Sequence, residues 1–261
     1  MPVITLTSDF GMRDPYAAAM KGVLRKHCPS VFIDDLTHDI APQDILEAAL
    51  FLEAAVPSYP EGTIHLVVVD PGVGTSRRAI AVGAGGHVFV APDNGLLSLW
   101  LKKYLPDWIY EIDPAVVDAA AISNTFHGRD IFAPAAAWLA NGGIPSRLGN
   151  ELPHIKQLNI PDPIYTDDNQ ITGTILHIDR FGNCITNIRR EEVETKIDSV
   201  HAGNHVIAFN NTYSDVPVHV PLALYGSGDR LEIAVNQANA SRQLGLTRGT
   251  PVIIVNGLLK R

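Results

Sequence analysis

The first 140 residues alternate between short apolar runs and helical patterns, and this alternation restricts the fold more than any other feature. Apolar runs rich in β-branched residues at 3–7, 31–36 and 64–69 predict strands. The segments between them, 14–27 and 44–55, have helical patterns. Strands that alternate with helices favour a three-layer α/β domain with a mostly parallel sheet.

Helix boundaries are marked by capping residues. Asp14 followed by Pro15 predicts a helix with Asp14 as its N-cap, and Pro29 stops it after residue 27. Asp44 with Glu47 three residues later is typical of a capping box. Further strands are predicted at 79–82 and 88–91, and further helices at 94–104 and 130–140.

The pattern changes after a proline-rich stretch at residues 145–163, which we interpret as a connection between domains. Beyond it, short β-rich runs separated by Gly, Asn and Asp predict a compact, barrel-like all-β domain. These runs lie at residues 171–178, 206–209, 231–235 and 252–255. The predicted domains are therefore 1–165, which includes the connection, and 166–261.

Composition excludes several classes of protein. A net charge of -8 and the absence of a Lys/Arg cluster argue against a nucleic-acid partner. The two cysteines, Cys28 and Cys184, are far apart, which argues against a zinc module or a disulfide scaffold. There is no secretory signal pattern and no apolar run near the roughly 20 residues that span a bilayer. We therefore expect a cytoplasmic protein with no membrane partner.

Four polar, glycine-containing clusters follow predicted strands. In an open α/β sheet this is the edge where ligands bind. The clusters are SDFG at 8–11, DPGVG at 70–74, PDNG at 92–95 and TFHGRD at 125–130. One such cluster is typical of any turn, but four in one chain indicate a site.

Common catalytic motifs do not account for these clusters. The segment 72–74 lacks the third glycine of a dinucleotide fingerprint, and the sequence contains no GxxxxGK[ST], GxSxG or HExxH motif. A divalent-metal site made of His38-Asp39, Asp93, His127 and Asp130 is disfavoured because these residues lack close ligand spacing. We interpret His38 as a hydrogen-bonded structural residue.

The ordered set of motifs resembles the SAM hydroxide adenosyltransferases, relatives of the bacterial fluorinase and chlorinase. Besides the four clusters, the similarity includes Tyr16 with Lys21-Gly22, and Arg77-Arg78. It continues through IDRFGN at 178–183, NTY at 211–213 and LEIA at 231–234. The resemblance implies an α/β domain, a β-barrel domain, and a homotrimer whose active sites lie between subunits.

The same resemblance implies hydrolysis of S-adenosylmethionine (SAM) to adenosine and methionine. In the hydroxide branch an Asp, an Arg and a His hold the attacking water, and they match Asp70, Arg77 and His127. The halogenases replace the acid and the histidine, so the hydroxide branch fits better. Asp70 would accept a proton from a water aligned with the ribose 5′ carbon. The reaction needs no metal and no cofactor.

Substrate contacts are also implied by the resemblance. In the first domain they fall on Asp9, which would bind the ribose hydroxyls, and on Asp14, Tyr16 and Asn94. In the second domain, Asp179 would meet the methionine ammonium group and Ser227 its carboxylate. The residues implied to frame the adenine are Asn183, Tyr225, Glu232 and Val235.

Two departures from the halogenases affect the substrate contacts. Residues 226–229 lack the arginine that the halogenases have at this place, and Ile185 stands where the fluorinase has a tryptophan.

Three alternative functions stay open. The first is a halogenase, which would form 5′-chloro-5′-deoxyadenosine from chloride. The second is a non-catalytic SAM or adenosine sensor, which would bind its ligand without turnover, and the third is a metal-dependent hydrolase, which a chelator would inhibit.

Overall fold

The computed structural model describes residues 1–117, 122–166, 170–193 and 196–256. The chain divides into two compact units, Met1–Leu158 and Asn159–Arg261. The boundary placed after residue 165 from the sequence falls within strand β7 (Ile164–Thr166). This strand pairs with β8 (Gln170–Ile178) of the second unit.

A six-stranded sheet with the order β2-β1-β3-β5-β4-β6 forms the centre of the first unit. Strands β2, β1, β3 and β5 are parallel neighbours, whereas β4 is antiparallel to both β5 and β6. The predicted mostly parallel sheet is confirmed. The strands are β1 (Val3–Ser8), β2 (Phe32–Thr37), β3 (Ile64–Val68), β4 (Ala79–Ala84), β5 (His87–Pro92) and β6 (Pro106–Glu111).

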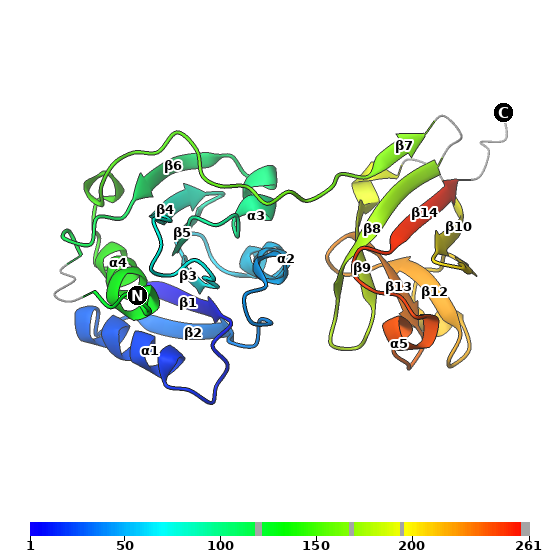
Figure 1. Ribbon diagram of the computed structural model, residues 1–261, viewed down its shortest axis with the longest axis horizontal. Helices are drawn as coiled ribbons and strands as arrows, with labels where there is room; N and C mark the ends of the chain where they lie inside the picture. The colour runs from blue at the N-terminus through cyan, green and yellow to red at the C-terminus, as the bar shows by residue number, and fades with distance from the viewer. Residues whose placement is uncertain (118–121, 167–169, 194–195, 257–261) are drawn as a thin grey trace. The chain divides into compact units, whose positions relative to one another are not determined.

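Helices cover both faces of this sheet, which confirms the three layers (Figure 1). Helices α1 (Tyr16–His27) and α4 (Ala133–Ala140) lie on one face, where Met20 and Phe132 pack with Leu6. Helices α2 (Ile45–Ala55) and α3 (Ser98–Lys103) lie on the other, where Leu52 and Trp100 pack with Phe89. Burial of these apolar faces fixes the register of every strand relative to the core.

The two predicted helix starts have different outcomes. The Asp44 carboxylate accepts a hydrogen bond from the Glu47 backbone N–H at 2.9 Å, so the cap at the start of α2 is confirmed. The prediction for α1 is wrong by one residue, because Pro15 occupies the N-cap and Asp14 precedes it. The ring of Pro15 fixes its φ at −78°, which suits the N-cap as well as the first helical position.

Three further elements of the first unit differ from the sequence-based expectation. The predicted helix 94–104 begins only at Ser98, because residues 94–97 form a turn. The predicted helix 130–140 begins earlier, with a π-helical turn over Gly128–Phe132 that continues into α4. Strand β6 was not predicted, because Pro106, Asp107 and Glu111 interrupt its apolar pattern, as is common at a sheet edge.

The second unit is an antiparallel sheet with the order β11-β10-β14-β8-β9-β13-β12. A bridge between Phe209 and Ala223 brings its two ends together, so the sheet is nearly closed and the predicted barrel-like domain is confirmed. Its other strands are β9 (Cys184–Arg189), β10 (Ile197–Ala202), β11 (His205–Ile207), β12 (Pro221–Tyr225), β13 (Arg230–Val235) and β14 (Pro251–Asn256). The remaining helical segments are α5 (Ala240–Leu244) and 3-10 turns at Val56–Ser58, Pro145–Arg147, Arg190–Glu192 and Tyr213–Asp215.

The PDNG cluster after β5 holds the chain that leaves the first unit. The buried Asp93 carboxylate forms an ion pair with Arg78 and accepts a hydrogen bond from the Lys156 backbone N–H at 2.7 Å. The Ser98 hydroxyl accepts one from the Leu158 N–H at 2.7 Å. Asp93 therefore has a structural role, because one of its oxygens binds the connecting segment and the other binds Arg78.

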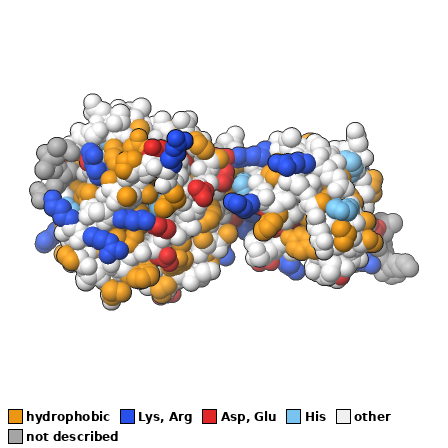
Figure 2. Space-filling model, turned by 90° about the horizontal axis from the view of Figure 1, so that it is seen from below, with side chains coloured by type: hydrophobic (Ala, Val, Ile, Leu, Met, Phe, Trp, Pro, Cys, Tyr) orange, Lys and Arg blue, Asp and Glu red, His pale blue; other side chains and the backbone are white. Residues whose placement is uncertain are grey.

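The surface carries charges of both signs. On the face shown in Figure 2, basic side chains are interspersed with acidic and polar ones. Within the described ranges, none of the helices has the length and hydropathy needed to cross a membrane. Cys28 and Cys184 are both buried and free.

Candidate active site

Asp70 and Arg77 form a buried ion pair at the carboxyl end of β3. Their side chains are 6% and 5% exposed. Arg77 Nε donates to both Asp70 carboxylate oxygens, at 2.9 and 3.0 Å, and Arg77 Nη2 donates to Oδ2. The guanidinium also stacks on the Phe132 ring, with Cζ 5.2 Å from the ring centroid. This geometry fixes the carboxylate, because the planar fork of an arginine leaves it little rotational freedom.

His127 completes this group. Arg77 Nη2 lies 2.7 Å from His127 Nδ1. A guanidinium can only donate, so Nδ1 accepts and the hydrogen of the neutral ring is on Nε2. Burial, and then the charge of Arg77, lower the pKa of His127 from its ordinary value of 6.5, although Asp70 and Asp130 act in the opposite direction. The neutral imidazole therefore keeps an Nε2–H donor, and both His127 and Asp70 line the same pocket.

The turn after β3 places Asp70 and Arg77 together. The Val73 N–H donates to the Asp70 carbonyl, and the Thr75 hydroxyl donates to the Gly72 carbonyl at 2.7 Å. Gly74 has a φ of 79°, and a Cβ there would lie 2.5 Å from the Asn124 carbonyl oxygen. A side chain at position 74 would push this turn away from the segment that carries His127.

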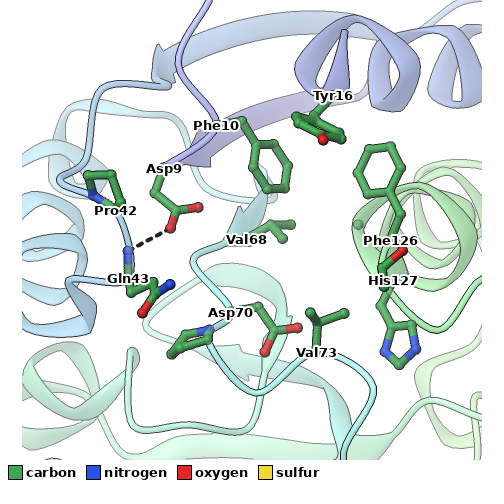
Figure 3. Close-up of a pocket in the computed structure, with 13 residues that line it drawn as sticks. Asp9, Phe10, Tyr16, Pro42, Gln43, Val68, Asp70, Val73, Phe126 and His127 are labelled. Atoms are coloured by element: carbon green, nitrogen blue, oxygen red, sulfur yellow. Dashed lines mark hydrogen bonds between the residues drawn. The ribbon is translucent and has the colours of Figure 1, made fainter. Parts of the chain in front are cut away.

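Asp70 and His127 line a pocket of about 340 Å³, whereas Arg77 lies behind them and is not part of its wall. Asp70 and His127 lie along one side of it, and the rings of Phe10, Tyr16 and Phe126 lie along the other (Figure 3). The three rings form a mutual cluster with centroid separations of 5.2 to 5.8 Å. The pocket thus has a polar side that can hold a water and an aromatic side that attracts cations.

Asp9 follows β1 and enters the same pocket. Its Oδ2 accepts a hydrogen bond from the Gln43 backbone N–H at 2.8 Å (Figure 3). Gln43 has a φ of 67°, a left-handed conformation that costs energy for a residue with a Cβ. This strained backbone presents its N–H to Asp9 and leaves the other carboxylate oxygen available for a ligand.

Of the other residues predicted in the first domain, only Tyr16 lines the pocket. Asp14 is exposed on the loop before α1 and is not among the pocket residues. The Asn94 side-chain amide donates to the Val69 carbonyl at 2.8 Å and its carbonyl accepts from the Leu96 N–H. Asn94 therefore braces the end of β3, next to Asp70, instead of lining the pocket.

The second unit has a pocket of about 620 Å³ at one end of its sheet. Of the six residues predicted there, Asn183 and Val235 line it. The other residues in its wall are Phe181, Tyr213, Gln237, Ala238 and Asn239. Phe181 is 76% exposed, so a large aromatic surface is available at this position.

Asp179 and Glu232 support this pocket from behind. Asp179 accepts hydrogen bonds from the Asn183 N–H at 2.8 Å and from its side-chain amide at 3.1 Å. The Tyr213 hydroxyl donates to Glu232 Oε2 at 3.3 Å. Burial, and then the charge of Asp179, raise the pKa of Glu232, although the bond from Tyr213 lowers it. These contacts orient Asn183 and Tyr213 in the pocket wall.

Tyr225 and Ser227 lie outside this pocket. The Tyr225 ring packs on Phe209, and the Arg190 guanidinium lies over it, with Cζ 4.7 Å from the centroid. Ser227 is exposed in the turn between β12 and β13. A Cβ at Gly226 in that turn would lie 1.7 Å from Glu232 Oε1, so a side chain there would displace the Glu232 carboxylate.

Sequence reasoning missed most of the aromatic residues in both pockets. Phe10, Phe126, Phe181 and Tyr213 all belong to the conspicuous motifs, but each motif was interpreted through its polar residues. A signal was present: Phe10 and Phe126 directly adjoin polar site residues, Phe181 lies between Asp179 and Asn183, and Tyr213 ends a polar motif. Gln43 had no comparable signal, since its left-handed backbone appears only in three dimensions.

The alternative metal site does not assemble. In the part of the chain that the structure describes, no group of three or more His, Cys, Asp or Glu side chains is arranged to hold a metal ion. Asp93 is paired with Arg78 and Asp130 with Arg129, so both carboxylates are neutralised by arginines.

Two family models match the chain. The SAM hydroxide adenosyltransferase N-terminal domain matches residues 4–149. The SAM hydroxide adenosyltransferase C-terminal domain matches residues 173–253. Together they cover both units, and they include every residue of the two pockets.

Full-length relatives agree with these matches. The chain is 42% identical to an (R)-S-adenosyl-L-methionine hydrolase of Thermus thermophilus, over 97% of this chain and 99% of the relative. It is 30% identical to a fluorinase of Nocardia brasiliensis, over 74% and 73%. A crystal structure of an uncharacterized conserved protein from Thermotoga maritima superposes with a TM-score of 0.89 at 34% identity, covering 97% of this chain and all of that one.

Proposed function

The chain belongs to the SAM hydroxide adenosyltransferase family, and from this premise we propose that it hydrolyses SAM to adenosine and methionine by attack of water on the ribose 5′ carbon. The observation that carries the proposal is the Asp70–Arg77–His127 group at the edge of a pocket. Because the relatives are named for the (R) sulfonium epimer, we propose the same epimer as substrate.

In a sulfonium substrate the nucleophile needs activation and the leaving group does not. When the bond from the 5′ carbon to sulfur breaks, its electron pair stays on sulfur and methionine leaves as a neutral thioether. The leaving group therefore needs no acid, and no metal or cofactor is required. Water is the difficult partner, because its pKa is about 15.7 before activation.

Each of the three residues has a separate role in activating that water. As the oxygen bonds to the 5′ carbon, one proton passes to the Asp70 carboxylate and then to solvent. The Nε2–H of His127 donates to the water oxygen and fixes its lone pair towards the carbon. Arg77 holds both partners and supplies positive charge where hydroxide character develops.

The opposite wall of the pocket suits the positively charged sulfur of the substrate. In-line attack requires the sulfonium to lie across the 5′ carbon from the water, and the rings of Phe10, Tyr16 and Phe126 lie across the pocket from Asp70. Aromatic faces attract a cation, whereas a neutral thioether gains less from them. Asp9 would bind the ribose hydroxyls through the oxygen that Gln43 leaves available.

We propose that the second unit binds the rest of the substrate, and that the protein is a cytoplasmic homotrimer with sites shared between subunits. The Asn183 amide and the exposed Phe181 ring suit a planar, polar base such as adenine. The two buried free cysteines fit a reducing compartment.

Analytical ultracentrifugation of the purified protein tests the proposed trimer. Co-expression of Asp70→Asn with Asn183→Ala chains tests shared sites, because mixed trimers would regain some activity.

The hydrolysis is tested by incubating the purified protein with SAM in water labelled with heavy oxygen. We expect adenosine whose 5′ oxygen carries the label, together with unlabelled methionine. Chloride added to the same reaction should give no 5′-chloro-5′-deoxyadenosine, because the Asp70 carboxylate repels an anion from the nucleophile position. Intact SAM after prolonged incubation, or a chlorinated product, would overturn the proposal.

A further inference from the structure

Ser8 and His38 form a buried pair directly behind the turn that carries Asp9. Ser8 ends β1 and His38 follows β2, and their side chains meet with Oγ 2.7 Å from Nδ1. Ser8 is fully buried and His38 is 4% exposed. Neither side chain lines the pocket, so the proposed chemistry does not use them.

His38 contacts the Asp9 turn at both of its ends. At the start of the turn, the Ser8 hydroxyl oxygen accepts a hydrogen bond from the Phe10 N–H at 3.3 Å. At its end, the Gly11 N–H donates to the His38 carbonyl at 2.7 Å. Gly11 has a φ of 65°, which lets the chain turn back towards His38. Asp9 is therefore held between two points that both depend on His38.

The outer side of His38 faces the Asp35 carboxylate. Nε2 lies 3.2 Å from Asp35 Oδ1, and the other oxygen of Asp35 is paired with Lys21. With the ring hydrogen on Nε2, facing Asp35, Nδ1 accepts the Ser8 O–H and the Ser8 oxygen remains free to accept the Phe10 N–H. His38 Nε2 itself approaches Asp35 without forming a hydrogen bond, so the bond to Ser8 is the one that orients the ring.

We propose that His38 is a positioning residue for ribose recognition: through Ser8 and through its own backbone it fixes the Asp9 carboxylate at the place where the ribose hydroxyls bind. This inference rests on the proposed function, because it takes Asp9 as the ribose acceptor. A preorganised carboxylate binds a diol more tightly, since no turn has to be ordered when the ligand arrives.

The first unit contains a matched control. Thr5 Oγ1 and His65 Nδ1 form another hydroxyl–histidine pair at 2.7 Å, and both residues are fully buried. Thr5 lies on the same strand as Ser8, but His65 continues to His87, at 3.1 Å, instead of to a turn of the pocket. Loss of His65 should therefore reduce stability without affecting ribose recognition.

The experiment compares the binding of adenosine and 2′-deoxyadenosine by calorimetry in the full-length protein. The wild type should prefer adenosine, and His38→Ala and Ser8→Ala should each reduce that preference by about tenfold, the value of a hydrogen bond to a charged group. His65→Ala should keep the wild-type preference while lowering the melting temperature. His38→Asn should retain most of the preference, because its amide reaches Ser8, whereas His38→Gln should not.

An unchanged preference in both Ser8→Ala and His38→Ala would overturn the inference, and so would an equal loss in His65→Ala. The two ligands are not turned over, so this test stands apart from catalysis. If the wild type binds adenosine selectively but leaves SAM intact, the proposed hydrolysis fails while the positioning role survives.

Discussion

Arg77 Nη2 lies 2.7 Å from His127 Nδ1. Because a guanidinium can only donate hydrogen bonds, Nδ1 must accept this one, and the contact therefore fixes the tautomer of His127. The same guanidinium binds Asp70 through two nitrogens. One arginine therefore determines both the orientation of the proposed base and the tautomer of the proposed water ligand His127.

Asp70→Asn should lower kcat by at least about 100-fold, because an amide of the same shape cannot accept the proton of the water. Affinity for adenosine should change by less than about threefold, since Asp70 is assigned to the water and not to the nucleoside. Chromatography of adenosine release and calorimetry measure the two effects. Asp93→Asn, which alters the ion pair of a buried Asp with Arg78, is the control and should reduce stability but leave kcat intact.

Arg77→Lys should reduce kcat by about tenfold or more although the positive charge is kept. A lysine ammonium cannot reach both Asp70 oxygens and His127 in one plane, so the tautomer of His127 is no longer fixed. Steady-state kinetics provide the measurement. Arg78→Lys is the adjacent control, and an equal loss of kcat in both variants would contradict the assignment.

The pH dependence of kcat should reflect the lowered pKa of His127. The neutral ring is the active form, and its ordinary pKa is 6.5. Because burial and Arg77 lower this value, kcat should stay constant as the pH falls through 6.5 and should decrease only at more acidic pH. A pH–rate profile with SAM tests this, and a decline that begins above pH 6.5 would show that the pKa is not lowered.

Acid should destabilise the protein through His65. Burial lowers the pKa of His65 to about 3 from 6.5, and the nearby His87 contributes in the same direction. The unfolded chain then binds more protons than the folded one, so the stabilising contribution is complete above pH 6.5 and is lost as the pH falls towards 3. Between pH 6.5 and 4.5 this amounts to at most about 2–3 kcal/mol. Urea unfolding at a series of pH values measures it, and His65→Gln should flatten the dependence.

Tyr16→Leu should weaken the binding of SAM by about two- to fivefold while leaving that of S-adenosylhomocysteine nearly unchanged. The two ligands differ in the charge on sulfur, and the aromatic cluster should favour the cation. Competition against adenosine gives both affinities. Phe32→Leu removes another exposed aromatic ring of the first unit and serves as the control; equal losses for both ligands would argue against a cation effect.

The sequence by itself determined the alternation of strands and helices, the change to a β-rich second part, and the order of the motifs. These features are local, because apolar periodicity and turn residues act over a few positions. Asp70 and Asp9 could be predicted for the same reason: each directly follows a buried strand, and the carboxyl ends of parallel strands meet at one edge.

Only the tertiary structure decided which polar residues face a ligand and which serve the fold. Asp93 and Asn94 have the same local signature as Asp70, yet Asp93 binds the connecting segment at Lys156 and Asn94 braces Val69. Likewise His38 and His127 are both single histidines in the sequence, and only their packing distinguishes them. A side chain's function depends on partners that are distant along the chain, as in the 50-residue separation of Arg77 and His127. Local propensity carries no information about such contacts, because burial of the whole core creates them.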